Sequence, residues 1–284
     1  MVDIYQKLSE CRSNGLDAVI VTVTEKDGMA PCDVGKKMIV IETGEAFGTI
    51  GGGSIEYFAR EKCKEIFKSR VSFTEKYLLS DKEIIPQKDT VKLNMACGGN
   101  VTLFYEFVGP KNYVYIFGAG HCGNALAKIL SPLGFHVTVI DDRASVLAEL
   151  DNSANIKLNL GFEDFFDKFS VKENAYFVVS TPSHLHDFEV LDKIFEKCIK
   201  PAYFGMLCSK KKIADYLDRI YAKYGKEIDL ENFYSPIGLD LGGDSPEEVA
   251  ISIASEILSH FYNKSEINSH MRNRIEPDQR YFKK

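Results

Sequence analysis

The sequence predicts an α/β protein in which an N-terminal α+β domain is followed by a doubly wound domain with a parallel sheet. From residue 113 onward, apolar strand-like runs alternate with helix-like runs, which is the pattern of parallel strands joined by right-handed crossovers. Before residue 109, apolar runs surround a bend and a helix, which favours a mostly antiparallel sheet. With 284 residues the chain is long enough for two domains.

The first domain is expected to span residues 1–110, because glycine and proline in the segment 109–112 mark a boundary. Its helix over 54–69 follows three glycines and places apolar side chains along one side. These are Ile55, Phe58, Ala59, Ile66 and Phe67. The other expected elements are a helix over 3–12, a strand over 17–28, a hairpin over 36–50 bending at Thr43–Gly44, and strands over 72–80 and 100–108.

The second domain is expected to span residues 111–262. Ser245 precedes Pro246 and Glu248 in the pattern of a capping box, which predicts that the last helix begins there. The expected strands cover 113–117, 136–141, 156–161, 175–181 and 201–207, and the expected helices cover 121–134, 162–169, 186–198 and 210–224. A polar tail follows from residue 263 to 284, which we expect to be disordered or to pack on a partner.

Composition excludes several classes of function. The net charge of −6 argues against a general binder of nucleic acid or of anionic membranes, which usually show a basic surface. The apolar runs are too short to span a bilayer, and the N-terminus lacks a basic-then-apolar signal pattern. We therefore expect a cytoplasmic protein without nucleic-acid or membrane partners.

Seven cysteines are present, and no two of them form a Cys-x-x-Cys pair. An odd count without such pairs suggests neither a disulfide framework nor a zinc ribbon. Cys63 and Cys198 lie on predicted helices and are expected to fill cores. Cys32, Cys97 and Cys208 lie in loop-like segments, where a thiol can reach a ligand.

A glycine pattern follows the first strand of the second domain. Gly118, Gly120 and Gly123 form a Gly-x-Gly-x-x-Gly motif between a strand and a helix, and Asp141 ends the next strand. In a Rossmann-like unit such glycines permit a tight turn and close approach to phosphate, and the acid accepts hydrogen bonds from ribose hydroxyls. This pattern predicts a Rossmann-like domain that binds NAD(P) or another nucleotide.

Further polar residues are placed where such a sheet holds its ligands. Thr181 and His184 follow the fourth strand, and His121 lies inside the glycine motif. Lys210–Lys212 begin a predicted helix, where three cations oppose the helix dipole unless an anion lies between them. For each of these histidines and lysines, a solvated surface role is the alternative interpretation.

The stretch Gly51–Gly53 precedes the helix that starts at Ser54. One interpretation is a tight turn that requires positive φ. The other is a row of backbone N–H groups that binds an anion at the start of a helix.

Several segments, taken together, resemble the XdhC/CoxI family of xanthine dehydrogenase accessory proteins. They are GMAPCDVGKKMIV, GTIGGGSIE, ACGGNVTLFYE, VYIFGAGHCGNALA, VTVIDDR, FGMLCSKKK and SPIGLDLGGDSPEEVAISIASEI. The resemblance implies a cytoplasmic carrier of the molybdenum cofactor, molybdopterin, rather than a catalyst. Such proteins protect the cofactor, support its sulfuration with a cysteine desulfurase, and deliver it to a xanthine dehydrogenase-like molybdenum hydroxylase. A homodimer is also implied.

By this resemblance, Cys97 is the main candidate ligand of the metal, with Cys32 as a substitute nearby. The alternative interpretation of Cys97 is a buried thiol beside glycines that only allow a bulge. Two departures from the family pattern are Ser54, where many members have cysteine, and Cys208-Ser209, where many have Gly-Ser. The full set of candidate cofactor-binding residues is Gly51, Gly52, Gly53, Ser54, Cys97, Gly98, Gly99, Gly118, Gly120, His121, Gly123, Asp141, Arg143, Thr181, His184, Ser209 and Lys212.

Two alternative functions stay open. An NAD(P)-dependent oxidoreductase would use the glycine motif and Asp141, with His184 or His121 as the acid–base group. A regulatory protein would sense a nucleotide and bind the hydroxylase without touching the molybdenum cofactor.

Overall fold

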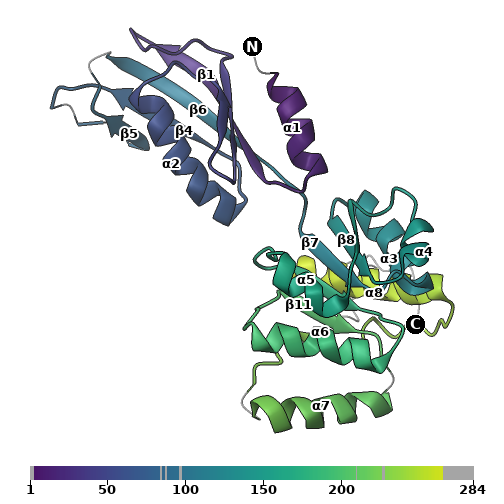
Figure 1. Ribbon diagram of the computed structural model, residues 1–284. Helices are drawn as coiled ribbons and strands as arrows, with labels where there is room; N and C mark the ends of the chain where they lie inside the picture. The colour runs from purple at the N-terminus through teal and green to yellow at the C-terminus, as the bar shows by residue number, and fades with distance from the viewer. Residues whose placement is uncertain are drawn as a thin grey trace, which may run out of the picture. The chain divides into compact units, whose positions relative to one another are not determined.

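The chain divides between Pro110 and Lys111, within the glycine- and proline-containing segment, into the units Met1–Pro110 and Lys111–Lys284 (Figure 1). The computed structural model describes residues 3–83, 85–86, 88–95, 98–208, 210–225 and 228–264, without the side chains of residues 210–212. Each unit carries its own six-stranded sheet.

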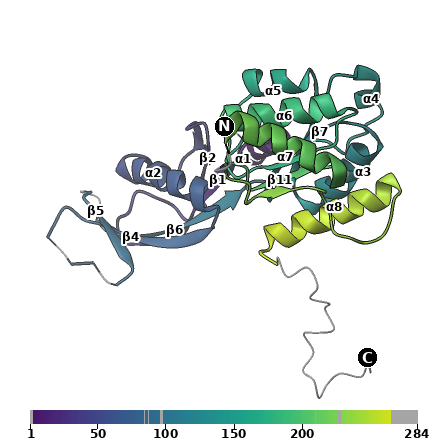
Figure 2. The ribbon, with the colours of Figure 1, turned by 90° about the horizontal axis from the view of Figure 1, so that it is seen from below.

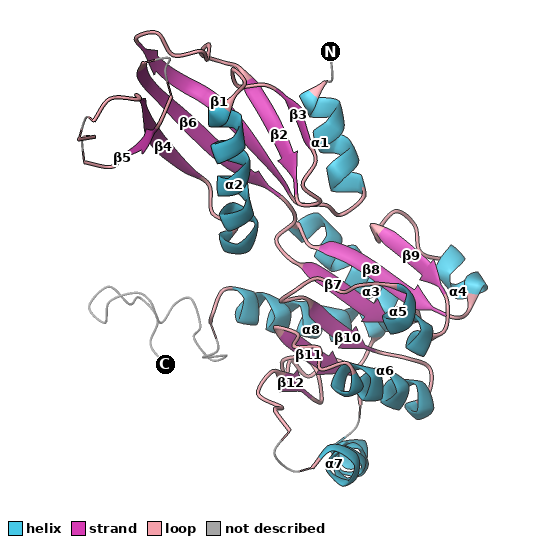
Figure 3. Ribbon diagram, turned by 60° about the vertical axis from the view of Figure 1, so that its left-hand side comes forward, coloured by secondary structure: helices cyan, strands magenta, loops and turns pink. Residues whose placement is uncertain are grey.

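The first unit is built on a mostly antiparallel sheet in the strand order β3-β2-β1-β6-β4-β5 (Figure 3). The strands are β1 (Ala18–Asp27), β2 (Lys37–Ile41), β3 (Ala46–Gly48), β4 (Phe73–Leu79), β5 (Thr90–Leu93) and β6 (Gly99–Val108). Only β4 and β5 pair in parallel. Alternating apolar and polar side chains along these strands give the sheet two faces, each of which needs a cover.

Two helices cover those faces, as Figure 1 shows. The first, α1 (Ile4–Ser13), packs through Cys11 on Ile20 and Ile39. The second, α2 (Ser54–Ser69), packs its buried residues on the other face. The expected apolar side is wrong at Phe58, which is 41% exposed, whereas Cys63 is buried in the core as expected. Residue 63 lies one turn after Ala59, on the side of the helix that meets the sheet.

The second unit is built on an all-parallel sheet in the order β12-β11-β10-β7-β8-β9. Its strands are β7 (Tyr113–Phe117), β8 (His136–Asp141), β9 (Ile156–Asn159), β10 (Tyr176–Val179), β11 (Tyr203–Met206) and β12 (Phe233–Tyr234). The central strands β7, β8, β10 and β11 are buried along their whole length, because helices cover both faces.

The covering helices form two layers. One face is covered by α3 (His121–Leu130) and α8 (Pro246–Phe261), with the short α4 (Ala144–Ala148) beside them. The other face is covered by α5 (Phe162–Lys168), α6 (His184–Glu196) and α7 (Lys210–Tyr224). Figure 2 shows α8 and α6 on opposite sides of the sheet. A 3₁₀ turn, Ser131–Leu133, extends α3, and Gly134 follows it with positive φ.

Several expected boundaries are met. The capping box at Ser245 and Glu248 is present and begins α8. Cys198, expected inside a helix core, is instead exposed, because α6 ends at Glu196 and Cys198 adopts a φ of 52° beyond it. The described helices include none that is long and apolar enough to cross a membrane.

The strand order of the second sheet indicates where a ligand crevice is expected. The chain leaves β7 toward β8 on one side, and the later strand β10 lies on the other side. In a doubly wound sheet, ligands bind outside the carboxyl ends of the strands at this change of direction. The segments that follow β7 and β10 carry the glycine motif and Thr181, so the fold brings these predicted residues together.

Candidate functional site

The triple-glycine loop of the first unit has a backbone that only glycine adopts readily. Gly51, Gly52 and Gly53 have φ values of 131°, 81° and 67°. A Cβ atom at Gly51 would lie 2.9 Å from the Cys32 sulfur. Gly51 is therefore required by packing, since it lets the loop lie directly against Cys32.

The carboxylate of Glu56 occupies the expected anion seat in this loop. Its Oε1 atom accepts hydrogen bonds from the N–H groups of Gly52, at 2.8 Å, and Ile50, at 3.1 Å. The hydroxyl of Thr49 donates to the same oxygen. Burial acts to raise the pKa of Glu56, but these hydrogen bonds outweigh burial and lower the pKa. The loop is thus both a tight turn with positive φ and an anion-binding site. The anion that it binds is the carboxylate of Glu56 in the same chain.

The remaining donors of the loop are free. The N–H groups of Gly53, Ser54 and Ile55 donate to no acceptor among the described residues, and the Ser54 hydroxyl has no partner there either. Gly53 has open space where a Cβ atom would be. The side of the loop that begins α2 can therefore still bind an anion.

The second glycine loop contacts the turn after β1. A Cβ atom at Gly99 would lie 2.5 Å from the carbonyl oxygen of Asp27 and 3.1 Å from the Ala30 nitrogen. Because Cys32 in the same turn contacts Gly51, the turn touches both glycine loops. Cys97, which precedes Gly98 in the sequence, lies outside the described residues. Cys32 is fully buried, and burial raises the pKa of its thiol.

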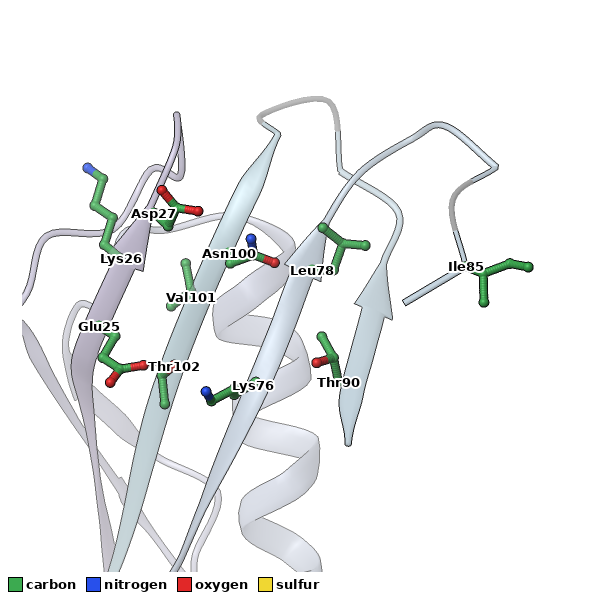
Figure 4. Close-up of a pocket in the computed structure, with 10 residues that line it drawn as sticks. All are labelled: Glu25, Lys26, Asp27, Lys76, Leu78, Ile85, Thr90, Asn100, Val101 and Thr102. Atoms are coloured by element: carbon green, nitrogen blue, oxygen red, sulfur yellow. Dashed lines mark hydrogen bonds between the residues drawn. The ribbon is translucent and has the colours of Figure 1, made fainter. Parts of the chain in front are cut away.

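A polar groove borders the second glycine loop. It has a volume of about 680 Å³ and crosses the ends of β1, β6, β4 and β5 (Figure 4). Asp27 and Asn100, next to Gly99, line it together with Lys76 and Glu25. Because both signs of charge line this groove, its electrostatics do not select an anionic cofactor.

The glycine motif of the second unit is closely packed at two of its three positions. A Cβ atom at Gly118 would lie 2.2 Å from the carbonyl oxygen of Ser180, and one at Gly123 would lie 2.0 Å from the carbonyl oxygen of Gly118. Nothing lies within 4 Å of the Cβ position of Gly120. The outer glycines thus hold strand and helix together, and the middle glycine leaves room for a ligand.

Unsatisfied polar groups surround that room. The N–H groups of His121, Cys122 and Gly123 donate to no acceptor among the described residues, in contrast to the Gly52 amide of the first unit. Ser180 Oγ and Asn124 Oδ1 are buried and lack a hydrogen-bond partner within the same part of the chain. His121 itself is exposed at the first position of α3. The N–H groups and the Ser180 hydroxyl can donate hydrogen bonds to a phosphate-bearing ligand at the start of α3, whereas the Asn124 oxygen can only accept.

Asp141 ends β8 in a buried position. Its carboxylate accepts hydrogen bonds from the Ala119 N–H at 2.7 Å and from Arg143, through Nε at 2.9 Å and Nη2 at 2.8 Å. Burial alone would raise the pKa of Asp141, but these partners lower it. The residue thus ties the glycine loop to Arg143.

A second cluster lies just beyond β10. Thr181 donates to Asp187, which is 4% exposed and also accepts from the hydroxyl of Tyr216 at 3.1 Å. His184 Nδ1 lies 3.2 Å from the same hydroxyl, and the His184 side chain is exposed. Burial raises the pKa of Asp187 despite its hydrogen bonds to Thr181 and Tyr216. Asp187, like Thr181, follows the fourth strand as expected for a ligand-side residue, whereas Tyr216, on the later helix α7, was not predicted.

Two further predicted site residues fall outside the described part of the chain, namely Ser209 and the side chain of Lys212. Among the residues that the structure describes, no group of three or more His, Cys, Asp or Glu side chains is arranged to hold a metal ion.

The fold and the glycine loops define a two-domain protein whose second unit is a dinucleotide-binding type of α/β domain. A family model described as the XdhC Rossmann domain matches residues 114–257, and one described as the XdhC and CoxI family matches residues 11–77. The first match alone covers half of the chain. The chain therefore belongs to the XdhC and CoxI family, which confirms the predicted family and the Rossmann-like domain.

Individual relatives agree with this assignment. Uncharacterized protein YqeB of Escherichia coli (strain K12) is 26% identical over 259 residues, which cover 90% of this chain and 46% of the relative. A protein of Bacillus subtilis (strain 168) that is described as a probable xanthine dehydrogenase subunit is 30% identical over 157 residues, which cover 55% of this chain and 45% of the relative. The chain thus spans about half the length of these curated relatives.

Among solved structures, one described as a xanthine dehydrogenase from Bacillus halodurans aligns with a TM-score of 0.49 and 19% identity. The alignment covers 93% of this chain and 97% of that chain.

Proposed function

We propose that this protein is an accessory protein that binds the molybdenum cofactor and supports its sulfuration and its insertion into a xanthine dehydrogenase-like molybdenum hydroxylase. Membership of the XdhC and CoxI family supports this role. The name of the Bacillus subtilis relative supports a client of the xanthine dehydrogenase kind.

One observation carries the proposal: the turn after β1 contacts both glycine loops of the first unit. Gly51 lies against Cys32, and Gly99 lies against Asp27 and Ala30. Three motifs that are far apart in the sequence therefore form one cluster of loops, and this cluster is assembled by contacts that exclude a side chain at either glycine. Ala30 and Cys32 belong to the core of this unit, and the first glycine loop, which packs on Cys32, leaves the N–H groups of Gly53 and Ser54 without an acceptor among the described residues.

The residues present fit the phosphate of molybdopterin on one side of the first loop. The free N–H groups of Gly53 and Ser54 and the Ser54 hydroxyl would donate hydrogen bonds to it. The Gly52 N–H is already bound to Glu56, so it contributes only if that carboxylate moves away. Cys97 would supply a thiolate, which is a soft ligand suited to a thiophilic metal.

The bound cofactor would supply the molybdenum chemistry, which takes place on the client enzyme. The protein's own residues would hold and shield the cofactor, and this task needs no general acid or base. A cysteine desulfurase as sulfur donor and a homodimeric assembly belong to the same proposal.

The test is to purify the protein from cells that make the cofactor, and to measure molybdenum by mass spectrometry and oxidised pterin by fluorescence after denaturation. The wild type should retain both. Cys97→Ala should lose most of the molybdenum with the fold intact, while Cys198→Ala, which removes an exposed thiol of the other unit, should not. Equal molybdenum in the Cys97→Ala variant would refute the thiolate ligand.

A nucleotide-sensing role is the second candidate function. The N–H groups at the start of α3 and the Ser180 hydroxyl favour it, because among the described residues these donors have no acceptor. Release of nicotinamide or flavin on denaturation, in place of pterin, would favour a nucleotide-dependent protein over a cofactor carrier.

A further inference from the structure

The acid that usually binds ribose in a Rossmann-like domain is fully engaged in this protein. Asp141 is 0% exposed, and both of its carboxylate oxygens accept hydrogen bonds from Arg143 and from the Ala119 N–H. A ribose hydroxyl that donates to this carboxylate would have to displace a charged partner. Asp141 is therefore poorly suited to recognise a free 2′-hydroxyl.

Arg143 keeps donors for a ligand. Its Nε and Nη2 atoms hold Asp141, whereas Nη1 has no hydrogen-bond partner among the described residues. The side chain is 40% exposed, so part of the guanidinium faces solvent while Asp141 fixes its orientation. A guanidinium held in this way is preorganised to bind a phosphate or carboxylate.

The hydrogen bonds also place Arg143 beside the glycine loop. The Asp141 carboxylate accepts hydrogen bonds from the Arg143 guanidinium and, at 2.7 Å, from the Ala119 N–H. Ala119 lies between the two glycines that shape the loop, next to the free N–H groups at the start of α3. A ligand whose first phosphate binds at α3 would therefore bring its ribose toward Arg143.

We propose that the Rossmann-like unit binds a nucleotide with a phosphorylated ribose, such as NADP, and that Arg143 selects it over the nucleotide with a free 2′-hydroxyl. The free amides of α3 bind the diphosphate, and Nη1 of Arg143 binds the 2′-phosphate. Asp141 acts as a positioning residue that orients the guanidinium. This inference concerns the second unit and does not depend on binding of the molybdenum cofactor by the first.

The neighbouring carboxylate of Asp142 opposes the binding of a phosphate at Arg143. Asp142 Oδ1 lies 4.0 Å from Arg143 Nε, and the Asp142 side chain is 42% exposed. A carboxylate at this place repels a phosphate. We therefore expect that Asp142→Asn strengthens the preference for the phosphorylated ribose.

The experiment is calorimetric titration of the full-length protein with 2′,5′-ADP and with 5′-AMP, and then with NADP⁺ and NAD⁺. The wild type should bind each 2′-phosphorylated compound at least about tenfold more tightly than its counterpart. Arg143→Gln should bring this ratio to about one without weakening 5′-AMP. Lys128→Gln, which removes an exposed cation of α3 that lies near Asp151, should leave the ratio unchanged.

Since Arg143→Gln leaves the buried Asp141 with fewer partners, its fold is checked by circular dichroism. The double variant Asp141→Asn with Arg143→Gln avoids the unpaired buried charge and should show the same loss of preference. The proposal is overturned if the wild type binds both members of a pair equally, prefers the free hydroxyl, or binds neither. It is also overturned if the preference survives without Arg143. None of these results alters the pterin and molybdenum measurement, so the two proposals fail separately.

Discussion

Glu56 Oε1 accepts a hydrogen bond from the Gly52 N–H at 2.8 Å, so the first glycine loop already holds a negative charge of its own. In the loop before α3 the Asp141 carboxylate accepts from the Ala119 N–H at 2.7 Å, while the N–H groups of His121, Cys122 and Gly123 donate to no acceptor among the described residues. Each glycine loop therefore binds a carboxylate of the chain and keeps further amides free at the start of its helix. Substitutions in the two loops can be tested separately, because the loops lie in different units.

Replacing Glu56 should lower stability in a pH-dependent way. Because its hydrogen bonds lower the folded-state pKa, Glu56 contributes stability above its unfolded pKa, and this contribution is lost as the pH falls through the folded value. Glu56→Ala should therefore cost about 1 kcal/mol at pH 7 and less near pH 4. Urea unfolding at both pH values measures the difference.

The control for this variant is Glu61→Ala, on the same helix, where only an exposed pair with Lys64 is lost. It should cost a few tenths of a kcal/mol, about 0.3. A cost of Glu56→Ala that grows on acidification would contradict the assigned role of the carboxylate.

Alanine substitutions at two glycines of the second unit should have different effects, one on folding stability and the other on nucleotide binding. Gly123→Ala places a methyl group 2.0 Å from the Gly118 carbonyl oxygen and should cost about 2–4 kcal/mol. Gly120→Ala meets open space at a φ of −60°, so it should cost less than about 1 kcal/mol. The same methyl group fills the room next to the α3 amides, and should therefore weaken nucleotide binding.

Unfolding curves and nucleotide titrations of the two variants measure these effects. Equal stability losses in the two variants would show that the packing assigned to Gly123 is absent. Unchanged binding in Gly120→Ala would place the nucleotide elsewhere.

Thiol labelling should follow burial. Cys198 is exposed, whereas Cys63 is fully buried and burial raises its pKa to about 12. In the native protein, iodoacetamide at pH 8 should modify Cys198 first and leave Cys63 untouched until the chain unfolds. Peptide mass mapping over time measures the order. Early modification of Cys63 would mean that α2 does not pack on the sheet as described.

Elements with a clear apolar run or period were predictable from the sequence, and elements without one were not. Helix α2 begins at Ser54 and ends at Ser69 as expected, because apolar spacing and flanking residues agree over four turns. The four-residue β5 and the five-residue α4 were missed. The equally short β10 and β11 were expected because they are continuous apolar runs, whereas β5 includes polar residues within a polar segment and α4 is too short to show a helical period.

The site shows the same division. The glycines could be predicted, since few other residues are tolerated at positions with positive φ or with close backbone contacts. The pairing of Glu56 with the loop was missed, although a glutamate at the third position of a helix is a known signal for a side chain that reaches back to the preceding amides. The pairing of Asp141 with Arg143 depends on how the end of β8 lies against the glycine loop, and no spacing in the sequence reveals that.

The proposed carrier role is tested by loading the protein with molybdenum cofactor, mixing it with a cofactor-free xanthine dehydrogenase-like hydroxylase, and measuring hydroxylase activity and molybdenum transfer. If this protein carries the cofactor, hydroxylase activity should rise in proportion to the molybdenum delivered, and this protein alone should turn over no metabolite. Failure to bind or deliver the cofactor, together with oxidation of a metabolite by the chain itself and a redox nucleotide, would contradict the carrier role.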